Sequence, residues 1–201
     1  MSSGQTAPAQ PPPAAPRPRT SVDALPAYRP GRSATTAMAD HGIDHAVKLA
    51  SNESPHGPLP SVAKAIEDAV ADVNRYPDHR ATALREAIGA NLGVEPARVA
   101  VGAGSVGLLQ QLVLAYTTPG DELAYGWPSF EAYPVYSALT CATPAAVPLR
   151  RMTLDAGRMV QALRPRTRLV LVANPNNPTG TALRTDELLA IADALPEGCL
   201  L

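Results

Sequence analysis

The sequence lacks the features that mark membrane, secreted and nucleic-acid-binding proteins. Its 201 residues contain no apolar run of membrane-spanning length and no signal-peptide core near the amino terminus. Seventeen basic residues face eighteen acidic ones, so a net charge of -1 leaves no basic excess for nucleic acid. We therefore expect a cytoplasmic protein that has neither membranes nor nucleic acids as partners.

Cysteine is scarce, and no metal site is predicted. Cys141 and Cys199 lie in different segments without metal or redox spacing, which predicts two buried, reduced thiols. His41 and His45 are spaced as a helical metal pair, but Gly42 argues against a helix there. No third ligand accompanies them in the sequence.

Proline, in contrast, is abundant at the amino terminus. Residues 1–30 interleave eight prolines with alanine and a few arginines. This composition has too little apolar mass to offset the entropy of ordering, so we predict a disordered tail. A proline-rich docking ligand is the alternative reading of the same segment.

From Val47 onward, helical and strand patterns alternate along the chain. Ser61 is placed to cap the first helix, Gly93 to end the second, and Pro134 to kink or end the fourth. The alternation predicts an α/β fold, a three-layer αβα arrangement around a mostly parallel sheet. Helices are expected over 61–74, 82–92, 105–116, 129–139, 154–163 and 185–195, strands over 99–101, 122–125, 145–148 and 169–173, and the start of a further strand over 199–201.

The loop after the apolar run 169–173 is the most informative segment. Two prolines, three asparagines and a glycine follow that run, in the order Asn-Pro-Asn-Asn-Pro-Thr-Gly over 174–180. This pattern predicts a rigid loop at the carboxyl end of a buried strand, where α/β sheets bind ligands. The alternative reading is that asparagine and proline simply build a turn there without any ligand.

A glycine-rich turn, residues 102–107, follows one predicted strand and opens a helix. Its glycines allow the backbone to approach a phosphate, and the amides at the helix N-terminus attract anions. The spacing also matches a dinucleotide fingerprint, but Asp121 and Glu122 stand at the start of the next strand rather than at its end. Glycines that merely permit close strand–helix packing are the remaining alternative.

Aromatic residues follow the strand predicted over 122–125. The segment 127–133 contains Trp127, Phe130 and Tyr133, and Phe130 is the single phenylalanine of the chain. An aromatic ring at a carboxyl edge of the sheet can lie against a flat heterocycle. Core packing is the alternative role for Trp127 and Tyr133.

Together, these motifs resemble the pyridoxal-phosphate (PLP) aminotransferases of fold type I. Within them, the chain is most similar to the histidinol-phosphate and aromatic amino acid (phenylalanine) aminotransferase branch, over Lys48 to Leu201 and the front half of the family. The resemblance implies transfer of an amino group from an L-amino donor to a 2-oxo acid such as 2-oxoglutarate, in amino acid biosynthesis. The residues at 104–106 and 129–134 are more similar to those of the aromatic aminotransferases, which favours an aromatic amino acid over histidinol phosphate as donor.

The resemblance also assigns cofactor contacts. The turn Gly104, Ser105 and Val106 would hold the phosphate of PLP, Phe130 would stack on its pyridine ring, and Asn177 would donate to its phenolic oxygen. Many family members have an acidic residue where Val106 stands, so only its backbone amide can serve.

Two further segments resemble parts of the family that complete the site. Tyr76, in Asn-Arg-Tyr-Pro-Asp, would reach from one subunit of a homodimer to the cofactor phosphate of the other. Asn52 and Glu53 would lie near the substrate, within an amino-terminal arm and entry segment over 31–60. Residues 61–201 would then be a partial PLP-binding large domain.

No catalytic residue is assigned within this sequence. Lys48 and Lys64 are its two lysines, and neither matches the family's Schiff-base lysine, which lies beyond Asn-Asn-Pro-Thr-Gly. We therefore expect the 201-residue chain alone to be inactive and to expose an unpaired sheet edge. Two alternatives stay open: a threonine-phosphate decarboxylase of related sequence, and a truncated, inactive fragment.

Overall fold

A computed structural model describes residues 17, 19–23, 25, 32–49 and 52–201 of the chain. The chain divides into two compact units, one formed by Met1–Leu25 with Leu109–Leu201 and the other by Pro26–Leu108. Most of the predicted tail, residues 1–30, lies outside the described residues. Its described part includes the short helix α1, Thr20–Asp23.

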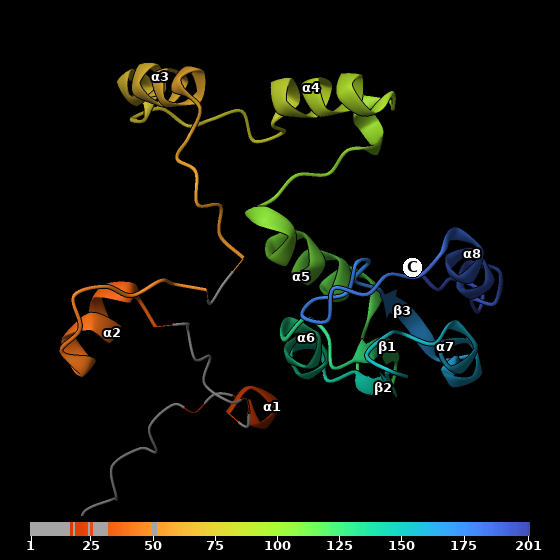
Figure 1. Cartoon of the computed structure of the whole chain (residues 1–201). Coiled ribbons are helices and arrows are strands. Elements are labelled where there is room, and N and C mark those ends of the chain that lie inside the picture. The colour runs from red at the N-terminus through yellow and green to blue at the C-terminus, as the bar shows by residue number, and fades with distance from the viewer. Residues whose placement is uncertain (1–16, 18, 24, 26–31, 50–51) are drawn as a thin grey trace, which may run out of the picture. The chain divides into compact units, whose positions relative to one another are not determined.

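The first unit is built on a parallel sheet with the strand order β2-β1-β3 (Figure 1). Its strands are β1 (Glu122–Trp127), β2 (Thr143–Pro148) and β3 (Thr167–Leu171). Leu200 forms a parallel bridge with Leu169, and its carbonyl accepts a hydrogen bond from the Val170 amide at 2.8 Å. The expected start of a further strand over 199–201 is confirmed by this pairing.

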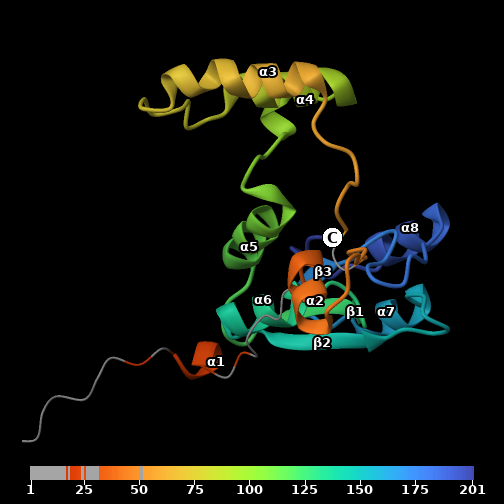
Figure 2. The same ribbon diagram turned by 60° about the vertical axis from the view of Figure 1, so that its left-hand side comes forward.

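Each face of the sheet is covered by helices, which makes three layers. Alternate residues of β1 and β3 point to opposite faces, because successive side chains of a strand do so. Leu123 and Leu169 enter one core with residues of α5 (Gly104–Tyr116) and α6 (Ala132–Thr140). Ala124 and Val170 enter the other with residues of α7 (Ala156–Ala162) and α8 (Thr185–Asp193). Figures 1 and 2 show α6 on one side of the sheet and α7 and α8 on the other. The predicted αβα fold is confirmed.

The connections around the sheet agree with local sequence signals. Asp155 caps α7, since its carboxylate accepts the Arg158 amide. The predicted turn 118–121 forms, and hydrogen bonds from Thr118 lower the pKa of the Asp121 carboxyl. Pro134 neither kinks nor ends α6, because it lies in the first turn, where its missing N–H has no intrahelical role.

The cysteine prediction needs a correction. Both thiols are free, but Cys141 is exposed at the left-handed C-cap of α6 and Cys199 is only half-buried. A cap position ends a helix at the surface, so it exposes its side chain whatever the residue's hydrophobicity.

The second unit is helical. It contains α2 (Ala34–His41), α3 (Pro60–Ala69) with a 3₁₀ turn over Val70–Asp72, α4 (Thr82–Leu92) and a 3₁₀ turn over Pro96–Arg98. The bounds predicted for the helix 82–92 are confirmed, and Gly93 caps it at φ +67°. Ser61 is not the cap of α3, because Pro60 already occupies its first turn and Leu59 precedes it.

The strand predicted over 99–101 does not form. The Val99 carbonyl instead accepts the Arg85 guanidinium Nε at 2.8 Å, and the same guanidinium donates to the Pro96 carbonyl at 2.7 Å. A three-residue apolar run becomes a strand only when another strand satisfies its backbone, and here a side chain does so.

Candidate functional site at the carboxyl edge of the sheet

Two loops leave the carboxyl ends of the adjacent strands β1 and β3. One connects β1 to α6 and contains Pro128, Ser129 and Phe130, while the other runs from β3 to α8 over 172–184. Parallel neighbours end at the same edge of a sheet, so these loops share one edge.

The β3–α8 loop is closed by its own side chains. The Asn174 carboxamide bonds to the backbone of Leu183 on both sides, as a neighbouring strand would. Its Oδ1 accepts the Leu183 amide at 2.8 Å, and its Nδ2 donates to the Leu183 carbonyl at 3.3 Å. Inside this closure, the Asn176 amide donates to the Thr181 carbonyl, and the Gly180 amide donates to the Asn176 carbonyl, both at 2.7 Å. The loop is thus held by hydrogen bonds along its length.

Asn176 joins this loop to the loop after β1. The side chains of Asn176 and Ser129 are buried, with residue exposures of 7% and 4%. Ser129 Oγ donates to Asn176 Oδ1 at 2.6 Å, and Asn176 Nδ2 donates to the Pro128 carbonyl at 3.2 Å and to Thr179 Oγ1 at 2.9 Å. Phe130 and Asn177 are the chain neighbours of this bonded pair, so their loops are fixed to each other.

Asn177 differs from the other two asparagines of the loop. It is exposed, and within the described part of the chain its side chain makes no hydrogen bond. Asn174 and Asn176 therefore build the turn, whereas the Asn177 amide remains available to a ligand.

Phe130 is half-buried and packs against the core that contains Leu123 and Leu169. Its ring packs edge-on against Tyr133, with centroids 5.7 Å apart and planes at 89°. Tyr133 is buried, and burial raises the pKa of its phenol. Tyr133 is thus a core residue, as one reading of the sequence proposed, while Trp127, whose ring contacts Tyr125, is 38% exposed.

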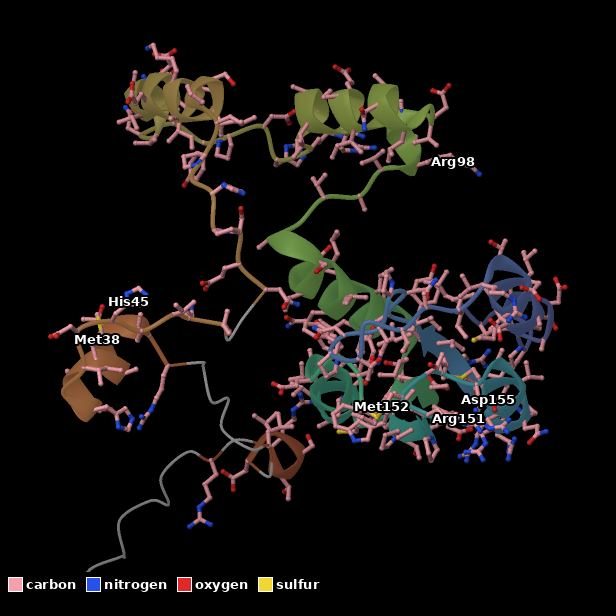
Figure 3. The ribbon with its side chains drawn as sticks, viewed as in Figure 1. Met38, His45, Arg98, Arg151, Met152 and Asp155 are labelled. Carbon is pink, nitrogen blue, oxygen red and sulfur yellow. The ribbon has the colours of Figure 1, made fainter. Side chains whose placement is uncertain are left out.

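A network of hydroxyl groups extends the contact to a third loop. Thr179 Oγ1 and Thr181 Oγ1 are 2.9 Å apart, and Thr181 Oγ1 donates to the Met152 carbonyl at 2.8 Å. Met152 lies in the hairpin Arg150–Thr153 that follows β2 (Figure 3). Neither threonine nor Asn176 was a candidate from the sequence, although hydroxyls and amides clustered in one loop were the available signal.

The glycine-rich turn, residues 102–107, belongs to the second unit. Gly104 has φ +69° and begins α5, and its amide donates to the Gly102 carbonyl at 2.8 Å. A side chain at Gly102 would come within 3.2 Å of Leu108, so the backbone there packs closely on the helix. Gly104, Ser105 and Val106 are all exposed at the N-terminal end of α5.

The remaining predicted residues also belong to the second unit. Tyr76 is fully exposed, and Asn52 and Glu53 are exposed. Glu53 pairs with Lys48 at 2.6 Å, and Lys64 pairs with Asp68 one helical turn away. Both lysines are therefore held in surface ion pairs.

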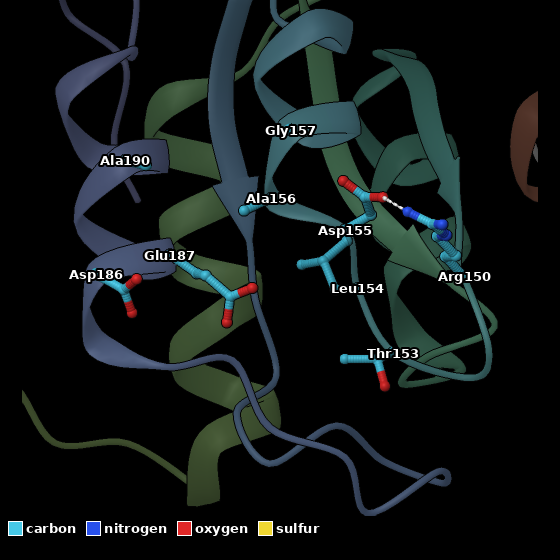
Figure 4. A pocket seen from close by; sticks show the side chains of 9 residues that line it. All are labelled: Arg150, Thr153, Leu154, Asp155, Ala156, Gly157, Asp186, Glu187 and Ala190. Carbon is cyan, nitrogen blue, oxygen red and sulfur yellow. Dashed lines mark ion pairs between the residues drawn. The ribbon is translucent and has the colours of Figure 1, made fainter.

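A surface hollow of about 460 Å³ lies elsewhere, near the N-terminal ends of α7 and α8 (Figure 4). Its carboxylates have local partners: Asp155 caps α7, Asp186 pairs with Arg184, and Glu187 accepts the Arg184 amide. Neither of the two joined loops contributes to its lining. Within the described ranges, no three metal-ligating side chains form a cluster, and His45 (Figure 3) belongs to none. Among the helices of the same residues, none has the length and hydrophobicity of a membrane span.

Known proteins resemble the chain over nearly all of its described length. The family described as aminotransferase class I and II matches residues 44–201. An aromatic amino acid aminotransferase of Thermobifida fusca is 52% identical over 183 residues, covering 90% of this chain and 49% of that protein. One of Rhodococcus opacus is 51% identical over 185 residues, with the same two coverages. The chain thus spans about half the length of the curated relatives it matches.

A solved structure agrees with these relatives. Histidinol-phosphate aminotransferase from Sinorhizobium meliloti, in complex with pyridoxal-5'-phosphate, superposes with a TM-score of 0.81 at 30% identity. The superposition covers 94% of this chain and 50% of that one.

Proposed function

The chain belongs to the class I and II aminotransferases, and on this premise we propose that it serves amino-group transfer from an aromatic L-amino acid to a 2-oxo acid. The cofactor would be pyridoxal phosphate, which the family uses. The observation that carries the proposal is the buried Ser129–Asn176 contact, which holds Phe130 and Asn177 on adjoining loops. The curated relatives named above support an aromatic donor.

Each of the two units contains groups that suit one part of a phosphorylated pyridine. An exposed, unengaged amide at Asn177 suits an anionic phenolic oxygen, and the Phe130 ring suits the face of a heterocycle. The exposed amides at the start of α5 suit a phosphate dianion.

When bound, pyridoxal phosphate supplies an aldehyde that exchanges amino groups and a ring that withdraws electrons from the amino acid. The residues of this chain would bind and orient it. The Asn177 amide would donate to the phenolic oxygen and so favour its ionised form, and Phe130 would exclude water from one face of the ring. Neither lysine of the chain is proposed to react, because both precede the loop 174–180, beyond which the resemblance places the reacting lysine.

A homodimer is part of the same proposal. The fully exposed Tyr76 side chain is free to enter a partner's site, and Asn52 and Glu53 would border the substrate. Light scattering on the chain fused to a carboxyl-terminal half of the family should give the mass of a dimer. A Tyr76→Phe variant of that enzyme should bind the cofactor more weakly while the mass of the dimer stays the same.

The activity test supplies the remaining length of the family. We would fuse the chain to the corresponding carboxyl-terminal half of the Thermobifida fusca relative and measure 2-oxo acid formation from phenylalanine. Phenylalanine should be the better donor, with histidinol phosphate as the competing substrate and the unfused chain as an inactive control. Robust turnover of histidinol phosphate without phenylalanine turnover, or release of carbon dioxide from threonine phosphate, would contradict the proposal.

A further inference from the structure

The carboxamide of Asn176 uses both of its ends, and each end reaches a different part of the site. Its oxygen accepts from Ser129, on the loop before Phe130, while its nitrogen donates to the Pro128 carbonyl and to Thr179. Residue 176 is 7% exposed, so these bonds are sheltered from competing water. A side chain that only filled space would not need these three hydrogen bonds to two different loops.

We propose that Asn176 is a positioning residue of the cofactor site: it locks the loop after β1 to the loop after β3, so that Phe130 and Asn177 are presented together. This inference rests on the proposed function, because it takes pyridoxal phosphate as the ligand that Phe130 and Asn177 share. Asn176 itself would not touch the ligand, since it is buried and its oxygen and both of its side-chain N–H groups bond to the protein.

The chemistry of the contact allows an isosteric test. Asn176→Asp keeps the acceptor facing Ser129 but replaces the donor group by a second oxygen, which faces the Pro128 carbonyl. A buried carboxylate there would repel that carbonyl and release the loops. Protonation restores a donor, and a buried carboxyl titrates above its ordinary range, so acid should reverse the defect.

Two readouts separate positioning from ligand contact. The first is ligand-free: hydrogen exchange of the Gly180 amide, which donates to the Asn176 carbonyl, and the emission of Trp127, the single tryptophan, next to Pro128. The second is the affinity of the 201-residue chain for pyridoxamine 5'-phosphate, which lacks an aldehyde and so cannot react with lysine.

For Asn176→Asp we expect faster exchange at Gly180, shifted Trp127 emission, and an affinity lower by roughly tenfold or more at neutral pH. The ratio of affinities between the unaltered and altered chains should shrink as the pH falls. For Asn177→Ala we expect a similar loss of affinity with unchanged exchange and emission. Asn91→Asp, the same replacement on the exposed surface of α4, should change nothing.

The outcomes are distinguishable. If the unaltered chain does not bind pyridoxamine phosphate, the assignment of Asn176 to a cofactor site is overturned, whereas the proposed function is decided separately by the turnover of the fused enzyme. If Asn176→Asp binds as tightly as the unaltered chain, the positioning role is overturned while the proposed function stands. If Asn176→Asp does not fold, Ser129→Ala decides, because it removes one bond of the contact. Unchanged affinity and exchange in Ser129→Ala would overturn the inference.

Discussion

The hairpin Arg150–Thr153 stores backbone strain that a single substitution should release. Arg151 and Met152 have φ angles of +49° and +65°, a left-handed region that side chains disfavour by about 1–2 kcal/mol per residue. The hairpin is nevertheless closed by two backbone hydrogen bonds, from the Arg150 amide to the Thr153 carbonyl at 2.8 Å and from the Thr153 amide to the Arg150 carbonyl at 3.0 Å.

Met152→Gly removes one of the two left-handed side chains. The relief of about 1–2 kcal/mol is partly offset by the greater freedom of glycine in the unfolded chain, which costs about 0.5–1 kcal/mol. Met152 is 56% exposed, so little burial is lost. Thr181 donates to the backbone carbonyl of residue 152, and this bond survives the change. The net expectation is a gain of about 0.5–1 kcal/mol in the free energy of unfolding.

Urea unfolding followed by circular dichroism measures this gain. Met152→Ala is the matched control, because it shortens the side chain but keeps the Cβ atom that causes the strain. We expect the glycine variant to be more stable than the alanine variant in urea and, in a thermal melt, to unfold a few degrees higher, since 1 kcal/mol is worth roughly 2–4 °C in a chain of this length. Equal or lower stability of the glycine variant would refute the strain argument.

Three further predictions test the packing and the caps. Ile191→Ala should cost about 2–5 kcal/mol because its side chain is fully buried under the sheet, whereas Leu189→Ala on the same helix, at 57% exposure, should cost little; equal losses in urea unfolding would contradict the placement of α8. Gly89→Ala should destabilise α4, since the added Cβ would lie 2.7 Å from the Val94 carbonyl, and an unchanged melting temperature would count against that packing. Hydrogen bonds from Thr82 and Arg80 lower the pKa of Asp78 from 3.8 to about 2, so the stability that its carboxylate gives the start of α4 should be complete above about pH 4 and be lost as the pH falls through about 2; a stability difference between Asp78→Ala and the unaltered chain that does not shrink over this range would show that the ionised carboxylate is not its source.

Secondary structure followed from the sequence where its cause is local. The helix Thr82–Leu92 has its predicted bounds because apolar spacing and the C-cap glycine Gly93 act within a few residues of each other. The strand expected at Val99 failed because strand formation depends on a partner, and the Arg85 guanidinium took that carbonyl instead. A periodic pattern cannot report which distant group will satisfy a backbone carbonyl.

The candidate site was likewise predictable from the sequence only where its cause is local. The sequence pointed to the carboxyl edge of the sheet and to Phe130 and Asn177, because turn formers after an apolar run are a local signal. Only the resemblance singled out Asn177, because the local pattern of turn-forming residues does not distinguish the three asparagines of the loop. Their separation into a strand substitute at Asn174, a buried link at Asn176 and an exposed amide at Asn177 depends on bonds to residues up to 48 positions away.

The sequence by itself therefore determined the layered α/β architecture, the order of most elements and the family, since these rest on periodicity, turn chemistry and motif order. Only the tertiary structure decided which side chain holds which loop. Asn176 and Ser129 are 47 residues apart in the chain and 2.6 Å apart between their bonded oxygen atoms. Burial at the end of two neighbouring strands brings them together, because a polar group excluded from water must find its partner among whatever residues the fold places beside it.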